Sequence, residues 1–203
     1  MKKYAVLHEP GDIVTLAGTR FVVLDVERCG SLPDSLFLLA LESVGASEFG
    51  SSNNYAESDL KKAVDKWLED MGKRGLDNAK LIPREIDLTT LDGSGFYGKL
   101  SVKAAPLTLD EAREYADIIP NAERWCWLAT GWSGPSKSDG DLALYVYPDG
   151  DWGGYYCSYS YGIRPALKIP SDLLLDSADK PDLSEVPTDT LLEEIRRRVV
   201  DKA

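Results

Sequence analysis

The chain has 203 residues, of which 43% are apolar and 28% charged, and its formal net charge is −11. This length suits one domain with an appendage, or two very small domains, and the composition is too apolar for a disordered protein. Polyphosphate backbones repel such an acidic surface, so we expect no nucleic-acid partner; the only dense basic run, residues 196–198, lies close to two glutamates.

The N-terminal segment begins with two lysines, as signal peptides often do. No apolar stretch of about 7–15 residues follows them, so we expect no signal peptide, although a chain whose leader had been removed would look the same. No run of about 18 apolar residues occurs, which predicts no membrane span and a cytoplasmic location for the chain as written.

The first elements along the chain are strands. Residues 12–26 cluster β-branched side chains around Gly18, which predicts a hairpin with arms at 13–16 and 20–26. Residues 35–43 form an apolar run that fits a buried strand or a short helix, because periodicity does not separate the two.

The clearest helical pattern follows Ser58, the expected N-cap. Asp59 lies in the first turn, where the helix dipole favours a negative charge, and Gly72 or Gly75 can end the helix. The apolar positions are three and four residues apart, on one face of the helix: Leu60, Ala63, Val64, Trp67, Leu68 and Met71.

Residues 80–104 predict short strands around a loop at 92–95. Thr108 and Glu111 then form a capping box, in which the hydroxyl and the carboxylate satisfy each other's backbone donors. We expect the helix that they begin to be short and to end before Pro120.

The region after residue 124 is richer in aromatic residues. Asp149-Gly150 predicts a hairpin turn, whose second arm is expected at residues 155–161. The first arm alternates between two faces, with Leu142, Leu144 and Val146 on one and Ala143, Tyr145 and Tyr147 on the other.

The chain end is predicted to lie outside the main domain, which we place at residues 1–169. Residues 170–187 read as an acidic linker, and residues 188–203 as an amphipathic helix capped by Thr188. The helix carries an apolar stripe without an adjacent core, so it packs on the domain or forms a homo-oligomer.

The strongest functional feature is the density of Tyr, Trp, Ser, Gly and Asp at residues 145–161. Tyrosine offers a large contact area at low conformational-entropy cost, and aromatic rings also stack on sugars and flat rings. A plainer interpretation is an antiparallel sheet whose exposed face tolerates tyrosine. The candidate ligand-binding residues are Trp132, Tyr145, Tyr147, Trp152, Tyr155, Tyr156, Tyr159 and Tyr161.

Two Asp-Gly-Asp segments offer a calcium site as an alternative, because Ca²⁺ takes roughly six to eight oxygen ligands. Asp-Gly is mainly a turn signal, however, and these segments bracket a predicted strand. The residues concerned are Asp139, Asp141, Asp149 and Asp151.

Catalytic patterns are scarce, and we expect no cofactor. His8 is the only histidine and is predicted to lie at the surface, which argues against a Ser-His-Asp or Cys-His arrangement. The chain has no phosphate-binding glycine loop. Cys29, Cys126 and Cys157 fit neither a disulfide framework nor a zinc site, so we expect reduced, buried thiols, with a single bridge as the alternative. Arg164 is expected to tie a loop through its planar guanidinium group.

Several short motifs appear in an order that resembles an uncharacterised domain family of gut bacteria and their phages. The closing run at residues 162–167 (GIRPAL) resembles that family's G-V-R-P-A-L, and Trp127-Leu128 stands in its W-L-R-S segment. The sequence departs from the family at the next two positions, which are Ala129 and Thr130. An N-x-Y-x-x-S-x-[LI] segment and a W-L helix are also matched, by Asn53, Asn54, Tyr55, Ser58, Leu60, Trp67 and Leu68.

That family is similar to the C-type-lectin-like fold of formylglycine-generating enzymes and phage receptor-binding proteins. The resemblance covers about residues 10–169 and implies an α+β domain with two helices, small antiparallel sheets and long loops. The generating enzymes hold copper with two cysteines, but Cys126 and Cys157 lack the surrounding motif. The calcium motifs of C-type lectins are also absent.

Three functions follow from these observations. The first is a non-catalytic module that binds a protein or a glycan, in a virion or at a host surface if the chain is encoded by a phage. The second is a copper-dependent cysteine oxidase that uses Cys126 and Cys157. The third is a structural subunit of a larger assembly.

Overall fold

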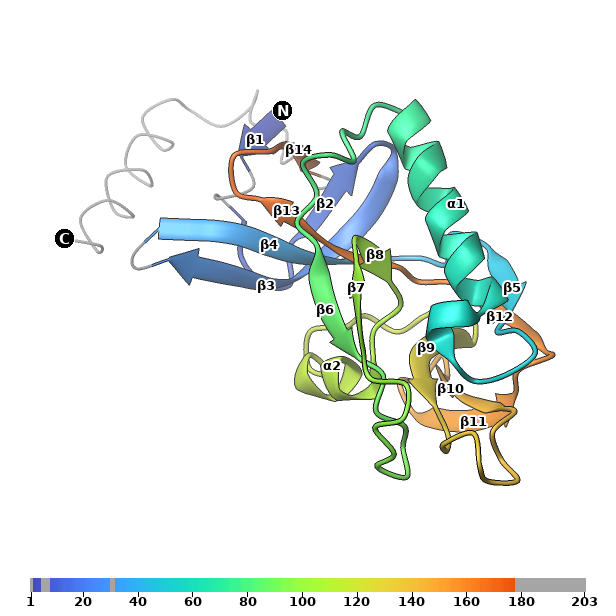
Figure 1. Ribbon diagram of the computed structural model, residues 1–203. Coiled ribbons are helices and arrows are strands. Elements are labelled where there is room, and N and C mark those ends of the chain that lie inside the picture. The colour runs from blue at the N-terminus through green and yellow to red at the C-terminus, as the bar shows by residue number, and fades with distance from the viewer. Residues whose placement is uncertain (1, 5–7, 30–31, 178–203) are drawn as a thin grey trace, which may run out of the picture.

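The computed structural model describes residues 2–4, 8–29 and 32–177. The cysteine at position 29 lies in a described strand, but its side chain lies outside the description. The expected C-terminal helix at 188–203 also lies outside the described residues. Within them the protein is an α+β structure with two α-helices and three sheets (Figure 1). None of the helices in these ranges is both long and apolar enough to cross a bilayer.

The largest sheet has seven strands in the order β1-β14-β2-β3-β4-β13-β8, and every neighbouring pair is antiparallel. Its strands are β1 (Lys2–Tyr4), β2 (Ile13–Leu16), β3 (Thr19–Cys29), β4 (Leu32–Ala40), β8 (Ala104–Ala105), β13 (Ala166–Pro170) and β14 (Leu174–Ser177).

The central strands of this sheet are apolar on both faces. Phe21 and Val23 of β3 join one core cluster, whereas Val22 and Leu24 join a second cluster on the opposite face. A strand covered on both faces reads as a continuous apolar run, and this explains why residues 35–43 gave no clear period. Most of that run belongs to β4 and is a strand.

The predicted N-terminal hairpin is confirmed as β2 and β3. Ala17 and Gly18 connect the strands, and both have positive φ, at 48° and 76°. Two consecutive left-handed residues match the right-handed twist of a hairpin, which favours glycine at this position.

Helix α1 (Asp59–Lys73) covers one face of the large sheet and follows a short 3-10 helix, η2 (Tyr55–Glu57) (Figure 1). The hydroxyl of Ser58 accepts a hydrogen bond from the backbone N–H of Lys61 at 2.9 Å, which confirms the predicted cap. The buried side chains of α1 are Leu60, Val64, Leu68 and Met71.

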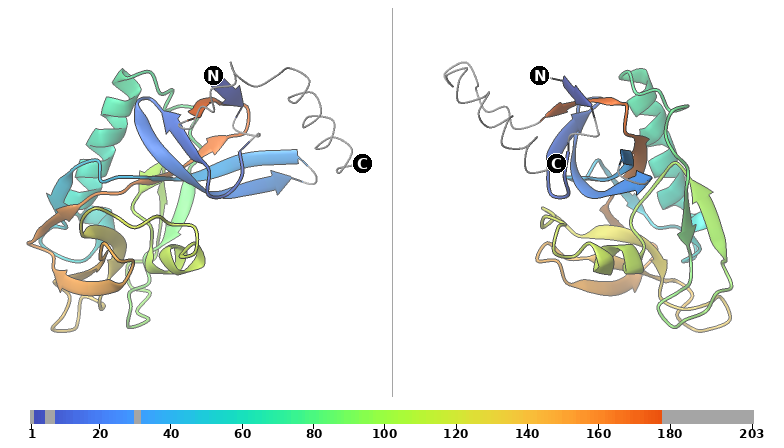
Figure 2. Two further views of the ribbon diagram at one scale, coloured as in Figure 1. Left: turned by 180° about the vertical axis from the view of Figure 1, so that it is seen from behind. Right: turned by 90° about the vertical axis from the view of Figure 1, so that its left-hand side faces the viewer.

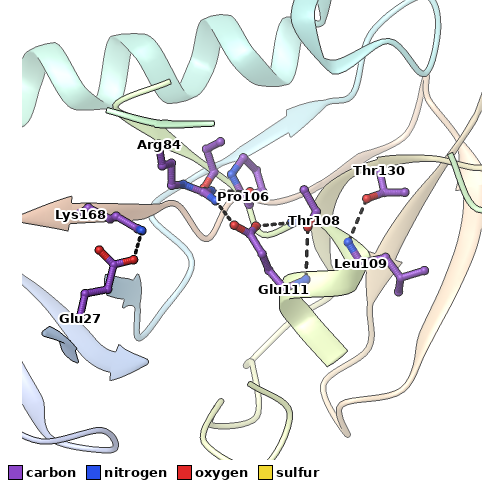
Figure 3. Close-up of polar contacts among 9 residues, drawn as sticks. Glu27, Arg84, Pro106, Thr108, Leu109, Glu111, Thr130 and Lys168 are labelled. Carbon is purple, nitrogen blue, oxygen red and sulfur yellow. Dashed lines mark hydrogen bonds and ion pairs between the residues drawn. The ribbon is translucent and has the colours of Figure 1, made fainter. Parts of the chain in front are cut away.

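Helix α2 (Leu109–Glu114) is short, as expected, and the capping box of Thr108 and Glu111 is present. Glu111 also pairs with the buried Arg84, whose guanidinium donates to the carbonyls of Ala105 and Pro106 (Figure 3). Arg84 begins strand β6 (Arg84–Asp87), which pairs with β7 (Lys99–Val102) around the predicted loop. This network fixes α2 between the sheets.

The second sheet has five strands in the order β11-β10-β9-β12-β5, and it lies at the opposite end of the molecule from β1 and β14 (Figures 1 and 2). The pairs are antiparallel except for β12 and β9, which are parallel. Its strands are β5 (Ala46–Glu48), β9 (Cys126–Gly131), β10 (Leu142–Val146), β11 (Trp152–Tyr156) and β12 (Ser160–Gly162).

Three local predictions differ from the structure. The arm expected at residues 155–161 is two strands, because the chain turns after Tyr156 and β12 leaves to pair with β5 and β9. The linker expected at 170–187 contains β14, which pairs with β1 and β2. His8 is buried, at 3% exposure, and its Nδ1 lies 3.2 Å from the carboxylate of Asp12 in the turn before β2.

Candidate functional site

The aromatic segment belongs to strands β10, β11 and β12, and the sheet register decides which way each ring points. Tyr145 of β10 lies opposite Trp127 of β9, whereas Val146 lies opposite Trp152. Cross-strand partners share a face of a sheet. The predicted alternation along β10 is therefore present, and it divides the candidate residues between two faces.

The candidate residues differ widely in exposure. Tyr145 is buried at 3% exposure, which corrects the prediction that it contacts a ligand directly: its position at the centre of the sheet places it inside. Trp152, Tyr156 and Tyr159 are exposed, at 42%, 52% and 51%. The remaining candidates are half-buried, namely Trp132, Tyr147, Tyr155 and Tyr161.

A continuous set of ring contacts connects one group of these residues, which we call the aromatic array: Trp125, Tyr147, Tyr155, Tyr156, Tyr159 and Tyr161. The ring of Tyr155 lies 4.6 Å from that of Tyr159, 5.8 Å from that of Tyr156 and 6.1 Å from that of Tyr161. The ring of Trp125 lies 5.3 Å from that of Tyr161 and 5.2 Å from that of Tyr147. These are edge-to-face or tilted contacts, which aromatic pairs prefer.

Trp125 is a residue of this array that the sequence reasoning missed. Its ring stacks on Tyr145 at a centroid distance of 5.3 Å and an interplanar angle of 13°, and its side chain is 39% exposed. The sequence feature that could have identified Trp125 is its spacing of two from Trp127, because residues two apart in an extended segment point to the same side.

A shallow groove borders the array. It has a volume of about 490 Å³ and is lined by Trp125 and Tyr161 together with Glu123, Arg124 and Ser160. Aromatic faces beside a carboxylate, a guanidinium group and a hydroxyl can stack on a ring and hydrogen-bond its substituents.

Two tyrosines of the array have a pKa above that of a free phenol. A hydrogen bond with Tyr159 raises the pKa of Tyr155, and burial raises the pKa of Tyr161. Beneath them, burial raises the pKa of Tyr145, whose hydroxyl lies 2.7 Å from that of Tyr147. Tyr155 and Tyr161 therefore offer flat apolar faces and uncharged hydroxyl groups rather than an ionised nucleophile.

The other face of the sheet looks toward α2. Trp132 packs there against Gly154, where an added Cβ would lie 2.3 Å from the indole ring. Next to it, α2 and the following turn enclose a cavity of about 420 Å³, the α2 cavity. Tyr147 and Trp152 are the two candidate residues that line it, and the guanidinium of Arg113 lies 5.2 Å from the centre of the Trp152 ring.

The structure gives little support to metal or thiol chemistry. Cys126 and Cys157 are buried and not bonded to each other, as expected for reduced thiols. Burial raises their pKa values to about 11 and about 12, so both are protonated and unreactive at neutral pH. Across residues 2–4, 8–29 and 32–177, no group of three or more His, Cys, Asp or Glu side chains could hold a metal ion.

The calcium alternative gains no support among the described residues. The Asp-Gly-Asp segments form turns: the N–H of Asp151 donates to the carboxylate of Asp149 at 3.2 Å, and the N–H of Leu142 donates to the carbonyl of Asp139 at 3.1 Å. Asp141 uses its carbonyl to accept a hydrogen bond from the N–H of Cys157 at 2.7 Å.

Arg164 has the structural role that was predicted for it. Its Nε donates to the carbonyl of Ala40 at 3.0 Å and its Nη1 to the carbonyl of Pro120 at 3.2 Å, which ties the end of β4 to the turn after α2. It also lines the α2 cavity.

Comparisons of the chain with protein-family models, with curated proteins and with solved structures found no match. The function must therefore be argued from the side chains themselves.

Proposed function

We propose that the protein is a non-catalytic binding module that recognises a protein or a glycan through the aromatic array. The observation that carries this proposal is the continuous set of ring contacts that ends in exposed residues, Trp125, Tyr156 and Tyr159. Exposed aromatic rings that are held in place by their neighbours lose little conformational entropy when a ligand covers them.

A C-type-lectin-like arrangement is part of the proposal. Two helices, antiparallel sheets and long loops within the described residues support it. In this arrangement loops and short strands at one end of the domain carry the binding surface. A phage or prophage protein that contacts its host is the setting that we propose for such a module.

The copper oxidase is the weaker alternative, because it requires reactive thiolates in an open site. Both thiols are buried and protonated, and Cys126 lines the α2 cavity. The structural-subunit alternative predicts that a second copy or a partner covers the array.

The test is the double variant Tyr156→Ala/Tyr159→Ala, measured on printed glycans and immobilised peptides. We expect binding to fall at least about tenfold while the melting temperature changes by less than about 4 °C, because half-exposed side chains contribute little to folding. The matched control is Phe96→Ala, which removes a ring of 73% exposure from the loop between β6 and β7 and should leave binding unchanged.

Three results would contradict the proposal. The double variant could retain its binding, it could lose its folded structure, or Phe96→Ala could lose binding to the same extent. Light scattering of the wild-type chain gives a fourth check: association that the double variant abolishes would favour the structural subunit.

A further inference from the structure

The α2 cavity is a second candidate site, which shares only Tyr147 with the aromatic array. Its walls come from α2, from the turn that follows it, and from the face of the five-stranded sheet that carries Val146 and Trp152. Most of its lining is apolar, including Leu109, Ala112 and Leu128. A volume of about 420 Å³ lies in the range of small-molecule sites, which are mostly apolar with a few polar groups that orient the ligand.

Arg164 supplies an unusual polar group to this lining. The residue is only 6% exposed, and none of the described residues forms an ion pair with it. Two of its N–H groups bind carbonyls, but Nη2 has no hydrogen-bond acceptor within the described part of the chain. A guanidinium group stays charged in proteins, and a buried charge without a counter-ion is costly.

Arg113 supplies a second positive charge at the rim, where its guanidinium lies over the ring of Trp152. Its side chain is half-exposed and its ion pair with Asp110 has an N–O distance of 3.5 Å, so it can turn toward a ligand. Asp149 is the one carboxylate in the lining. The cavity is therefore net positive in a chain whose formal charge is −11.

We propose that the α2 cavity binds a small amphipathic carboxylate, with a flat apolar body between α2 and the sheet and its carboxylate directed toward Arg164 and Arg113. The apolar lining accepts the body, and Trp152 provides a face for it to stack on. The carboxylate offers the acceptor that Nη2 of Arg164 lacks. Nη2 is shielded from water, so lining side chains must shift slightly before an oxygen reaches it.

The proposal can be tested separately from the aromatic array, because Tyr147 is the one array residue that also lines the α2 cavity. Tyr156 and Tyr159 do not line the α2 cavity. The double variant of these tyrosines should therefore bind the carboxylate normally, so that failure of one proposal leaves the other standing.

The test is calorimetric titration of the full chain with three probes that share one ring system: indole-3-acetate, indole-3-acetamide and tryptamine. A charge-assisted hydrogen bond is stronger than a neutral one, so we expect the acetate to bind at least about tenfold more tightly than the acetamide. Tryptamine should bind most weakly, because its ammonium group meets two guanidinium groups.

Variants distinguish the contribution of charge to binding from the contribution of the shape of the site. Arg113→Gln should weaken the acetate several-fold and leave the acetamide unchanged, whereas Lys137→Gln, the same charge change on a loop outside the cavity, should alter neither. Ala112→Phe, which fills the cavity, should weaken all three probes. The proposal is overturned if acetate and acetamide bind equally, if none of the probes binds, or if Lys137→Gln has the effect of Arg113→Gln.

Discussion

The two large sheets of this protein use different side chains, and the difference follows from how each sheet is covered. The central residues of β3 and β4 in the seven-stranded sheet are buried on both faces and are mostly aliphatic, such as Val22 and Leu38. Strands β10 and β11 of the five-stranded sheet are partly exposed and carry Tyr and Trp. A ring with a polar atom suits a surface that is half apolar and half wet. We infer that the first sheet provides stability and the second provides recognition.

The largest loss of stability is expected where a polar network joins the two-stranded sheet to the seven-stranded sheet and to α2. In Arg84→Ala, Glu111 loses its buried partner and the carbonyls of Ala105 and Pro106 lose their donor. Breaking a buried ion pair by removing one partner costs about 3–5 kcal/mol, so we expect a loss of that order in the free energy of unfolding, measured with urea.

Lys99→Ala is the matched control for Arg84→Ala. It removes a cation from the paired strand β7, where Lys99 bridges Glu85 at 2.9 Å and both side chains are exposed. An exposed ion pair contributes about 0–1 kcal/mol. Equal losses in the two variants would show that the network does not join the sheets.

A smaller loss of stability is expected for a substitution inside the five-stranded sheet. Gly154→Ala would place a Cβ within 2.3 Å of the Trp132 ring, so the indole must move. Overpacking of this kind costs about 1–3 kcal/mol and should also alter the tryptophan fluorescence. Gly45→Ala, where an added Cβ meets no atom within 4 Å, should change neither quantity. Unchanged stability and fluorescence in Gly154→Ala would place Trp132 elsewhere.

The smallest effect is expected in the pH dependence of stability, through a side chain of the seven-stranded sheet. A hydrogen bond from Lys168 is the main cause that lowers the pKa of Glu27, which also accepts a hydrogen bond from Ser35 at 2.7 Å. Because the pKa of Glu27 is lower in the folded than in the unfolded state, its ionised form stabilises the protein at pH values above the unfolded-state pKa of about 4.3. That stabilisation is lost as the pH falls through the folded-state pKa.

Glu27→Gln should therefore lower the free energy of unfolding at pH 7 by less than about 1 kcal/mol, because the pair is partly exposed and solvent screens it. The difference between wild type and variant should shrink between pH 5 and pH 3. A difference that stays constant, or that grows on acidification, would show that the carboxylate charge has no such role.

Local signals predicted the elements that are determined by neighbouring residues. The β2–β3 hairpin, the Ser58 cap and the capping box of α2 each depend on residues within a few positions of one another. The α+β class follows from such elements taken together.

Long-range pairing was not predictable from the sequence. Arg84 and Glu111 are 27 positions apart, and nothing in their local patterns links them. The separation of β12 from β11 depends on β5, more than a hundred residues earlier in the chain. Asn53, which belongs to a motif of the resembling family, proved to be buried and to donate to the carbonyls of Ser133 and Leu142.

Only part of the candidate site was predicted, because its arrangement also depends on long-range pairing. The density of rings identified the region, but the register of Tyr145 with Trp127 decides that Tyr145 supports the array from within. Neither the α2 cavity nor the role of Arg164 in its lining could be read from the sequence, because the cavity is assembled from segments that meet only in the folded chain.

The pairing of β1 with β14 places the first and last strands of the described chain side by side, at the end of the molecule farthest from β11 (Figures 1 and 2). A protein immobilised on a sensor chip near these two strands would hold its aromatic rings toward the flowing solution. The same orientation would suit multivalent display on a bead or a particle, in which many copies point their rings outward and gain avidity from weak individual contacts.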